Sequence, residues 1–334
     1  MIDFRSDTVT KPCNKMRDIM YHAPVGDDVY GDDESVNQLE AYARLRFNVA
    51  DALFCSSGTQ ANLLALMAHC ERGDEYICGQ SAHNYKFEGG GAAVLGSIQP
   101  QPIENEADGS LCFTKIAAAI KPDDSHFAKT RLLSLENTIG GKVLGIDYLI
   151  KAREFVDQHN LALHLDGARA FNAAAELNLD IKEITKHFDS VSICLSKGLG
   201  APVGSLLLGS EQLIAKARRW RKVLGGGMRQ AGMLAAAGQY ALENNTQRLV
   251  DDHANARYLA QQLSEISGFE VNMSNTTNMV YATFDNSINI TKLAADLKAQ
   301  GILISPSKQL RLVTHLGITQ ADIDTFIKAL TAHI

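Results

Sequence analysis

The stretch Ser-Ile-Cys-Leu-Ser-Lys-Gly-Leu-Gly-Ala-Pro-Val-Gly, residues 192–204, decides the fold. Its apolar start predicts a buried strand that ends at Lys197, and the glycines after the lysine let a bulky group lie close to the backbone. An amine held at the end of a buried strand can condense with a carbonyl compound to form a Schiff base. A lysine that closes a strand with its head in water is the common alternative. Three further segments argue against that alternative.

The first of these segments is Leu-Ala-Leu-His-Leu-Asp-Gly-Ala-Arg, residues 161–169. Asp166 lies 31 positions before Lys197 (197 − 166), which is the length of one strand–helix–strand unit. Both side chains would then project from the carboxyl ends of parallel strands, where open α/β sheets bind ligands. A carboxylate at that place keeps a pyridine nitrogen protonated, whereas Asp-Gly alone is more often a plain turn.

The second segment, Phe-Cys-Ser-Ser-Gly-Thr-Gln-Ala-Asn at residues 54–62, reads as strand, tight turn and helix. The N–H groups around Ser57 and Gly58 and the hydroxyl of Thr59 would hold a phosphate, although ordinary N-caps look the same. In the third segment, His83 is placed to stack on a cofactor ring. Together with Lys197 and Asp166, these residues predict a pyridoxal 5'-phosphate site.

Four longer motifs extend this reading: Asp-Phe-Arg-Ser-Asp-Thr-Val-Thr (3–10), Val-Gly-Asp-Asp-Val-Tyr-Gly-Asp (25–32), Gly-Gly-Gly-Met-Arg-Gln (225–230) and Arg-Leu-Val-Thr-His (311–315). With them, nearly the whole chain resembles the low-specificity L-threonine aldolases, which are pyridoxal-phosphate enzymes of the aspartate-aminotransferase-like fold (fold type I). The resemblance implies an α/β fold with a large, mostly parallel sheet domain and a small α/β C-terminal domain. It also implies retro-aldol cleavage of L-threonine and L-allo-threonine to glycine and acetaldehyde.

The resemblance also implies roles for individual residues, with Lys197 forming the internal aldimine. The implied catalytic residues are Lys197, His83, His126 and Asp166. The implied cofactor-binding residues are Ser57, Gly58, Thr59, His83, Asp166, Arg169, Lys197, Lys222 and Arg229. The implied substrate-binding residues are Ser6, Tyr30, Arg169 and Arg311, and no metal is expected.

Two points stay open within this resemblance. The base that removes the proton of the β-hydroxyl is His83, His126 or a bound water, and we favour His126 and water because a stacked imidazole aims its nitrogens sideways. The family commonly has a histidine and an asparagine after Glu-Asn-Thr at 136–138, where this chain has Ile139 and Gly140. This departure removes a polar contact near the site.

Composition limits the other function classes. A hydrophobic fraction of 46% over 334 residues is enough for two domains with a large core. The net charge of −6 and the lack of a broad basic stretch argue against nucleic acid as a partner. Six cysteines without metal-binding spacing, no signal peptide and no long apolar run indicate a cytoplasmic protein with no membrane contact.

Strand-like and helix-like segments alternate along most of the chain, which predicts a mostly parallel sheet covered by helices on both faces. Short strands are expected at 51–55, 75–78, 92–95, 131–135, 161–165, 191–195 and 205–208, with helices between most of them. We expect an N-terminal arm with few helical repeats (1–20), a large cofactor-binding domain (21–244) and a small C-terminal domain (245–334).

Rival functions remain. Another fold type I enzyme, an aminotransferase or a β-eliminating lyase, would use the same anchors for the cofactor. A nicotinamide-dependent dehydrogenase is disfavoured because no Gly-x-Gly-x-x-Gly follows a strand. A non-catalytic binding protein would not need Lys197, Asp166 and the Thr59 turn together. The segment of Lys222 and Arg229 leans, in the family, toward a neighbouring subunit, which implies a homotetramer with shared sites for a small amino acid substrate.

Overall fold

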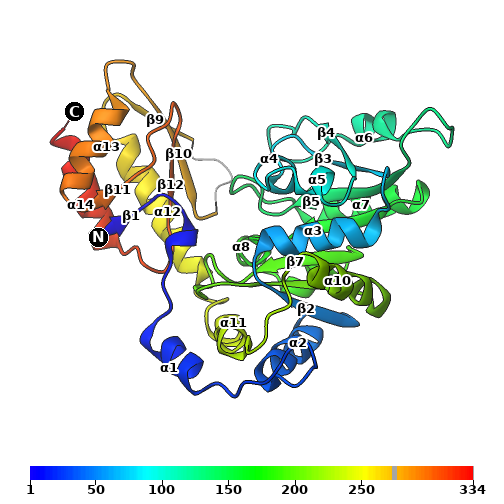
Figure 1. Ribbon diagram of the computed structural model, residues 1–334. Coiled ribbons are helices and arrows are strands. Elements are labelled where there is room, and N and C mark those ends of the chain that lie inside the picture. The colour runs from blue at the N-terminus through cyan, green and yellow to red at the C-terminus, as the bar shows by residue number, and fades with distance from the viewer. Residues whose placement is uncertain (273–276, 334) are drawn as a thin grey trace.

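The computed structural model describes residues 1–272 and 277–333. A large unit is built around a central sheet, and a smaller unit contains both chain ends (Figure 1). The N-terminal elements are β1 (Ile2–Asp3), the 3₁₀ helix η1 (Asp7–Val9), α1 (Asn14–His22) and α2 (Glu34–Phe47).

The large unit then alternates strands and helices as the sequence indicates. Its elements are β2 (Asp51–Cys55), α3 (Gly58–His69), β3 (Glu75–Gly79), α4 (His83–Lys86), α5 (Gly91–Val94), β4 (Gln99–Ile103), α6 (Phe113–Ala119), β5 (Thr130–Glu136), α7 (Ile146–Gln158), β6 (Ala162–Asp166), α8 (Ala170–Leu177), α9 (Ile181–Thr185), β7 (Ser190–Cys194), β8 (Ser205–Gly209), α10 (Glu211–Val223) and α11 (Gly232–Asn244).

The central sheet has seven strands in the order β2-β8-β7-β6-β5-β3-β4. Only β8 runs antiparallel to its neighbours, and the other pairings are parallel. The predicted α/β class with a large, mostly parallel sheet is therefore confirmed. Because β5, β6 and β7 are parallel neighbours, their carboxyl ends meet at one edge, and that edge carries the candidate site.

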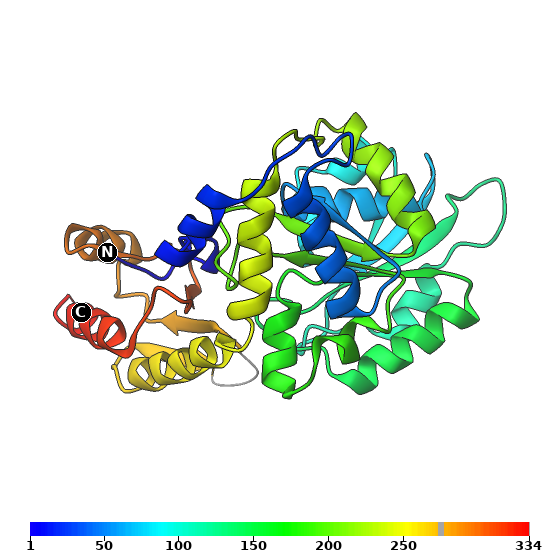
Figure 2. The same cartoon turned by 90° about the horizontal axis from the view of Figure 1, so that it is seen from below.

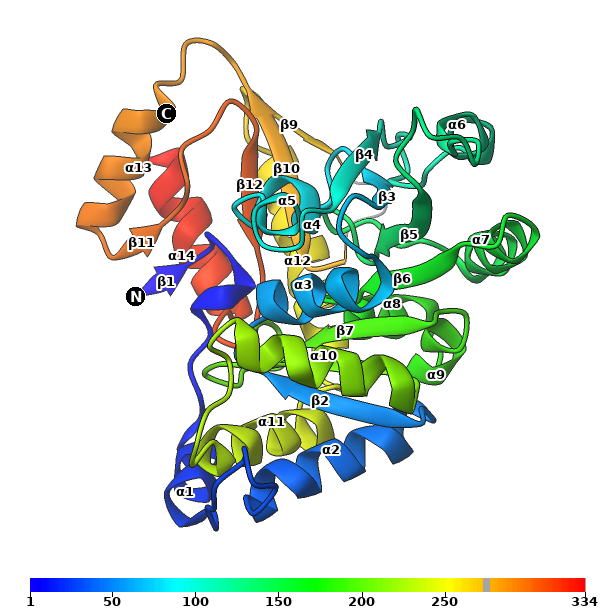
Figure 3. The ribbon, with the colours of Figure 1, turned by 45° about the vertical axis from the view of Figure 1, so that its right-hand side comes forward.

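Side chains alternate along each central strand between two buried faces. Leu53, Cys55 and Leu207 face α3 and α10, which lie over one side of the sheet (Figure 3). Phe54 and Leu208 join the larger core on the other side, where α2, α7, α8 and α11 pack. Within that layer α11 lies between α1 and α2 (Figure 2). Burial on both faces explains why the strands read as continuous apolar runs.

The smaller unit has its own hydrophobic core and two small sheets. Its elements are α12 (Leu249–Ser264), β9 (Phe269–Asn272), β10 (Met279–Phe284), α13 (Ile290–Ala299), β11 (Ile302–Leu303), β12 (Leu310–Val313) and α14 (Gln320–Thr331). β12, β10 and β9 form an antiparallel sheet, and β1 pairs in parallel with β11. Phe4 packs in this core, so the start of the chain is joined to its end.

One local prediction was wrong, and one strand was not predicted. Residues 92–95 were expected to form a strand, but Gly91–Val94 is the short helix α5, since a four-residue apolar run does not distinguish the two structures. The strand of this region is β4, which the pattern missed because it contains Pro100 and Pro102; prolines are tolerated there because β4 is the edge strand.

The N-terminal arm also differs from the expectation of few helical repeats, because α1 occupies Asn14–His22. Only Met16 of this helix is buried, so its apolar pattern is weak. Among the described helices, none is both long and apolar enough to cross a membrane.

Candidate active site

A cavity of about 960 Å³ lies where the carboxyl edge of the central sheet meets the smaller unit. The N-terminal segment, the ends of the central strands and the sheet of β10 and β12 all contribute to its wall. The lining residues that matter here are Ser6, His83, Glu136, Arg169, Lys197, Tyr281 and Arg311.

Lys197 follows β7 and reaches into this cavity. Its backbone carbonyl accepts a hydrogen bond from Thr10 Oγ1 at 2.8 Å and from the Gly200 N–H at 2.9 Å. Gly200 has a φ of +78°, which only glycine adopts readily, so the chain turns sharply after the lysine. The Lys197 amine makes no hydrogen bond or ion pair with a residue of 1–272 or 277–333, so the backbone is fixed and the amine is available.

Asp166 ends β6, the strand next to β7, and is buried. Its Oδ2 accepts a hydrogen bond from Asn62 Nδ2 at 2.7 Å, and its Oδ1 accepts one from the Ala168 N–H at 3.1 Å. Both donors stabilise the ionised carboxylate. The Asp166 carboxylate and Lys197, which lies three residues past the end of β7, are therefore at the same edge of the sheet.

His83 belongs to a cluster with two carboxylates. Its Nδ1 lies 2.8 Å from Glu88 Oε1, and Asn62 Nδ2 donates to the same oxygen at 2.8 Å. The hydrogen bond to Glu88 raises the pKa of His83, and burial raises the pKa of Glu88. Glu88 and Asp166 each place a carboxylate oxygen within 4.8 Å of a ring nitrogen of His83 and within 4.8 Å of each other. The hydrogen bonds from His83 and Asn62 to these carboxylates account for this arrangement.

The start of α3 fits the phosphate of the predicted cofactor. Ser57 Oγ caps the helix by accepting from the Gln60 N–H at 3.1 Å, which leaves the N–H groups of Gly58 and Thr59 without a partner in the described part of the chain. The buried hydroxyl of Ser205 also lacks a partner there and lies 3.6 Å from where a Cβ on Gly58 would be. Asn62, about one turn further along the helix, already reaches Asp166. Unpaired donors at a helix N-terminus suit an anion.

Arg169 lines the cavity but is already engaged by Asp7. The guanidinium donates to both carboxylate oxygens of Asp7, from Nε at 2.8 Å and from Nη2 at 2.6 Å. Burial raises the pKa of Asp7, but the charge and hydrogen bonds of Arg169, together with the Lys197 charge and the hydrogen bond from Asn278, outweigh burial and lower that pKa to about 2. A bidentate grip by Arg169 on a substrate carboxylate therefore cannot use the Nε–Nη2 edge, and Nη1 is the nitrogen that remains.

Arg311 lies on β12 opposite Tyr281 of β10. Its Nη2 donates to the carbonyl of Arg5 at 3.0 Å, and the residue lines the cavity. Ser6 lines the same wall, but its hydroxyl accepts from the Thr8 N–H at 3.2 Å as the cap of η1. Both residues sit on the side of the cavity formed by the smaller unit and the N-terminal segment.

Glu136 is a cavity residue to which the sequence reading gave no role. It ends β5, and its Oε2 accepts from the His83 backbone N–H at 2.8 Å. Burial, followed by the nearby charge of Asp166, raises the pKa of Glu136 to about 7. Asp166 and Lys197 were predicted because each is a charged residue that follows an apolar strand-like run. Glu136 follows such a run as well, so the same pattern could have identified it. Asp7, Glu88 and Asn62 carry no comparable signal.

Besides Ser57, Gly58, Thr59 and Asp166, which were described above, four more expected site residues are not among those that line this cavity. The His126 side chain is 84% exposed and is bonded to Asp124 on the loop before β5. Tyr30 is 78% exposed. Lys222 lines a separate groove at the end of α10, and Arg229 forms an ion pair with Asp27 at 2.8 Å. The fold brings together Ser6, His83, Asp166, Arg169, Lys197 and Arg311, and it leaves these four apart.

Ile139 and Gly140 also line the cavity. Ile139 is buried, and its backbone N–H and carbonyl both pair with Lys142 at 3.0 Å. The isoleucine side chain therefore presents hydrocarbon, not a hydrogen-bond donor, to this part of the wall.

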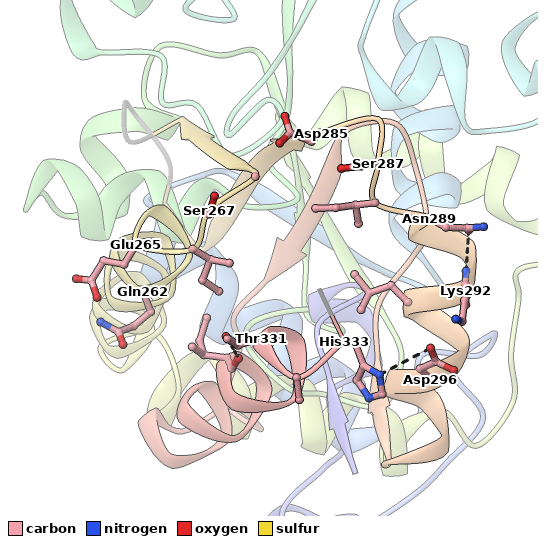
Figure 4. A pocket seen from close by; sticks show the side chains of 16 residues that line it. Gln262, Glu265, Ser267, Asp285, Ser287, Asn289, Lys292, Asp296, Thr331 and His333 are labelled. Atoms are coloured by element: carbon pink, nitrogen blue, oxygen red, sulfur yellow. Dashed lines mark hydrogen bonds and ion pairs between the residues drawn. The ribbon is translucent and has the colours of Figure 1, made fainter.

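A second cavity of about 1030 Å³ lies in the smaller unit between α12, α13 and α14 (Figure 4). Its wall carries both acidic and basic side chains, among them Asp285, Asp296, Lys292 and His333. His333 Nδ1 lies 3.8 Å from Asp296 Oδ2. It contains none of the residues expected at the active site, and we assign it no role.

Comparisons with known proteins agree with this site. The family model described as beta-eliminating lyase matches residues 3–286. A low specificity L-threonine aldolase of Escherichia coli K12 is 57% identical over 97% of this chain and 96% of its own length. A low-specificity L-threonine aldolase of Arabidopsis thaliana is 42% identical over 96% of this chain and 93% of its own. A threonine aldolase structure from Leishmania major shares the fold, with a TM-score of 0.84 at 22% identity over 99% of both chains. The chain is a member of the beta-eliminating lyase family and, within it, of the low-specificity L-threonine aldolases, which depend on pyridoxal 5'-phosphate.

Proposed function

We propose that this protein cleaves L-threonine and L-allo-threonine into glycine and acetaldehyde. The observation that carries the proposal is Lys197, whose amine makes no hydrogen bond or ion pair with the described residues, at the same sheet edge as the hydrogen-bonded Asp166 carboxylate. The 57% identity to an aldolase over nearly the whole chain supports the choice of reaction. Such an enzyme would act in threonine catabolism and glycine formation, and we place it in the cytoplasm.

Each group of the site has a task in this proposal. The start of α3 would hold the cofactor's phosphate, Lys197 would bind the cofactor covalently, and Asp166 would keep its ring nitrogen protonated. When bound, the cofactor would supply an electron-accepting ring for cleavage of the Cα–Cβ bond. Arg311, together with Arg169 Nη1 and Ser6, orients the substrate carboxylate.

The proton of the substrate's β-hydroxyl needs a base. His83 is the histidine of this chain that lines the cavity, and its Nε2 is left for proton transfer because Nδ1 bonds to Glu88. His126 acts as the base only if the His126 of a neighbouring subunit reaches the cavity of this chain. A bound water held by either imidazole is the third route. Imidazole is a common general base because it gains and loses a proton within the physiological pH range.

We propose that the assembly is a homotetramer whose sites are shared, with Tyr30, His126, Lys222 and Arg229 completing the cavity of a neighbouring chain. Their exposed positions outside the cavity of their own chain support this. Light scattering gives the assembly size. Mixing and reassembling inactive Lys197→Ala and Arg229→Ala chains should restore part of the activity, because some sites then carry neither change. No recovery in a mixture proven to contain hybrids would contradict the sharing.

Steady-state assays on separate isomers test the reaction itself. Both L-threonine and L-allo-threonine should release acetaldehyde, with the allo isomer faster, and D-threonine should not react. The bond to the cofactor, the plane of the cofactor ring and the arginine-bound carboxylate would together fix the geometry at Cα. The hydrocarbon wall at Ile139 leaves the configuration at Cβ loosely controlled. Efficient cleavage of D-threonine would overturn the proposed arrangement.

β-Elimination is the second candidate, because the matching family model is described as beta-eliminating lyase. An eliminating enzyme would release ammonia and a keto acid from serine or cysteine, and an aminotransferase would need an added keto acid. Measuring acetaldehyde, ammonia and keto acids from the same reactions separates the three activities.

A further inference from the structure

A buried array of polar side chains runs beneath α3 and ends on Asp166. Its members are Asn62 and His69 of α3, His164 of β6, and Ser190 and Ser192 of β7; we call them the polar array. The parallel register sets His164 beside Ser190 and Asp166 beside Ser192, so all four lie on the strand face that α3 covers (Figure 3).

The direction of every hydrogen bond in the polar array follows from its end on Asp166. Both partners of Asn62 Nδ2 are carboxylate oxygens, those of Asp166 at 2.7 Å and Glu88 at 2.8 Å, so the amide nitrogen must face them. Asn62 Oδ1 must then accept from its other two partners. These are Ser192 Oγ at 2.7 Å and His164 Nε2 at 3.2 Å.

The same reasoning determines which ring nitrogen of each histidine donates a hydrogen bond. His164 donates from Nε2 and is neutral, since burial lowers its pKa to about 3, so its Nδ1 accepts from the Ser190 hydroxyl at 2.8 Å. The Ser190 oxygen then accepts from His69 Nε2 at 2.8 Å, and burial likewise lowers the pKa of His69, to about 4. Each donor points toward Asp166, and bonds aligned in this way strengthen one another.

Stability does not explain this arrangement. Elsewhere the same layer is hydrocarbon, with Leu53, Cys55 and Leu207 packed under α3 and α10. Burying polar groups costs free energy even when they are paired, and apolar replacements of similar size are often neutral or stabilising. The polar array therefore points to a function at its end, where Asp166 meets the cofactor.

We propose that the polar array is a positioning device: it locks the Asn62 amide with its N–H groups toward Asp166 and so holds that carboxylate in place for the cofactor's ring nitrogen. Without a donor to Oδ1, the amide of Asn62 is free to turn its oxygen toward two carboxylates, which would repel it. The inference rests on the proposed role of Asp166.

Three variants test the proposal in the holoenzyme. Ser192→Ala and His164→Leu each remove one donor to Asn62 Oδ1, whereas His164→Gln keeps an amide N–H near the place of the imidazole donor. The matched control is Ser134→Ala, which removes a buried strand serine that bonds to Asn84 and not to the polar array.

We expect kcat to fall about tenfold to a hundredfold in the two donor-deleting variants, by analogy with the supporting shell of metal ligands, with KM for threonine little changed. The pH at which the bound cofactor's absorbance changes should shift, and the dissociation constant for pyridoxal 5'-phosphate should rise. His164→Gln should recover most of both. Wild-type kcat and an unshifted spectrum in Ser192→Ala would overturn the proposal even if His164→Leu failed to fold.

Nitrogen-15 NMR of histidine-labelled protein without cofactor tests the array separately from catalysis. His164 and His69 should both carry the proton on Nε2 and should not titrate between pH 5 and 8. If either titrates near pH 6.5, the proposed bond directions are wrong. A parent holoenzyme that does not cleave threonine, with this NMR signature intact, would instead count against the proposed function and not against the array.

Discussion

The Asp7–Arg169 ion pair gives a prediction whose size follows from the structure. Asp7 is fully buried, accepts two bonds from Arg169, and is contacted by Asn278 Nδ2 at 3.4 Å. Asp7→Asn keeps the shape but removes the negative charge, which leaves the Arg169 guanidinium buried without its counter-charge. We expect the folded protein to lose stability and the N-terminal segment to loosen from the cavity wall.

The pKa of Asp7 sets the magnitude. A fall from 3.8 to about 2 corresponds to about 2 kcal/mol, at 1.36 kcal/mol per pKa unit. Because the pKa is lower in the folded state, this contribution is present above pH 4 and is lost as the pH falls through 2. With an m-value of about 3 kcal/mol/M, the urea midpoint of Asp7→Asn should lie about 0.7 M below that of the parent at pH 7.

Urea unfolding followed by circular dichroism at one fixed protein concentration measures this difference. Asp123→Asn, in the exposed loop before β5, is the matched control and should leave the midpoint within experimental error. The gap between Asp7→Asn and the parent should shrink to about half at pH 3. Equal midpoints for the two variants at pH 7, or a gap that does not shrink in acid, would refute the reasoning.

Three further changes probe the site. Lys197→Ala should abolish turnover and the absorbance of lysine-bound cofactor, and a normal spectrum in this variant would exclude Lys197 as the attachment point. Arg311→Ala should raise KM for threonine at least tenfold while cofactor binding, measured by absorbance titration, stays close to that of the parent; an unchanged KM would remove Arg311 from the carboxylate site. Glu136→Gln should remove an inflection near pH 7 from the pH profile of kcat/KM, because burial raises the pKa of Glu136 to about 7; a profile identical to that of the parent would show that Glu136 does not titrate in the reaction.

The sequence by itself determined the fold class and the anchors on the central strands. An apolar run that ends in one charged residue is a local signal, and it marks the ends of β6 and β7 because burial on both faces makes these strands hydrophobic throughout. The chain spacing of Asp166 and Lys197 then follows from one strand–helix–strand unit. The same locality explains the failure at residues 92–95, where four apolar residues suit a helix as well as a strand.

Only the tertiary structure decided which polar groups meet across the chain. Asp7 pairs with Arg169 over 162 positions, and Asn62 with Asp166 over 104, and neither contact leaves a pattern in the neighbouring residues. Tertiary contacts also left His126, Tyr30, Lys222 and Arg229 outside the cavity of their own chain. The physical reason is that periodicity and turn chemistry report how a segment contacts the core, whereas the pairing of buried charges depends on how distant segments pack together.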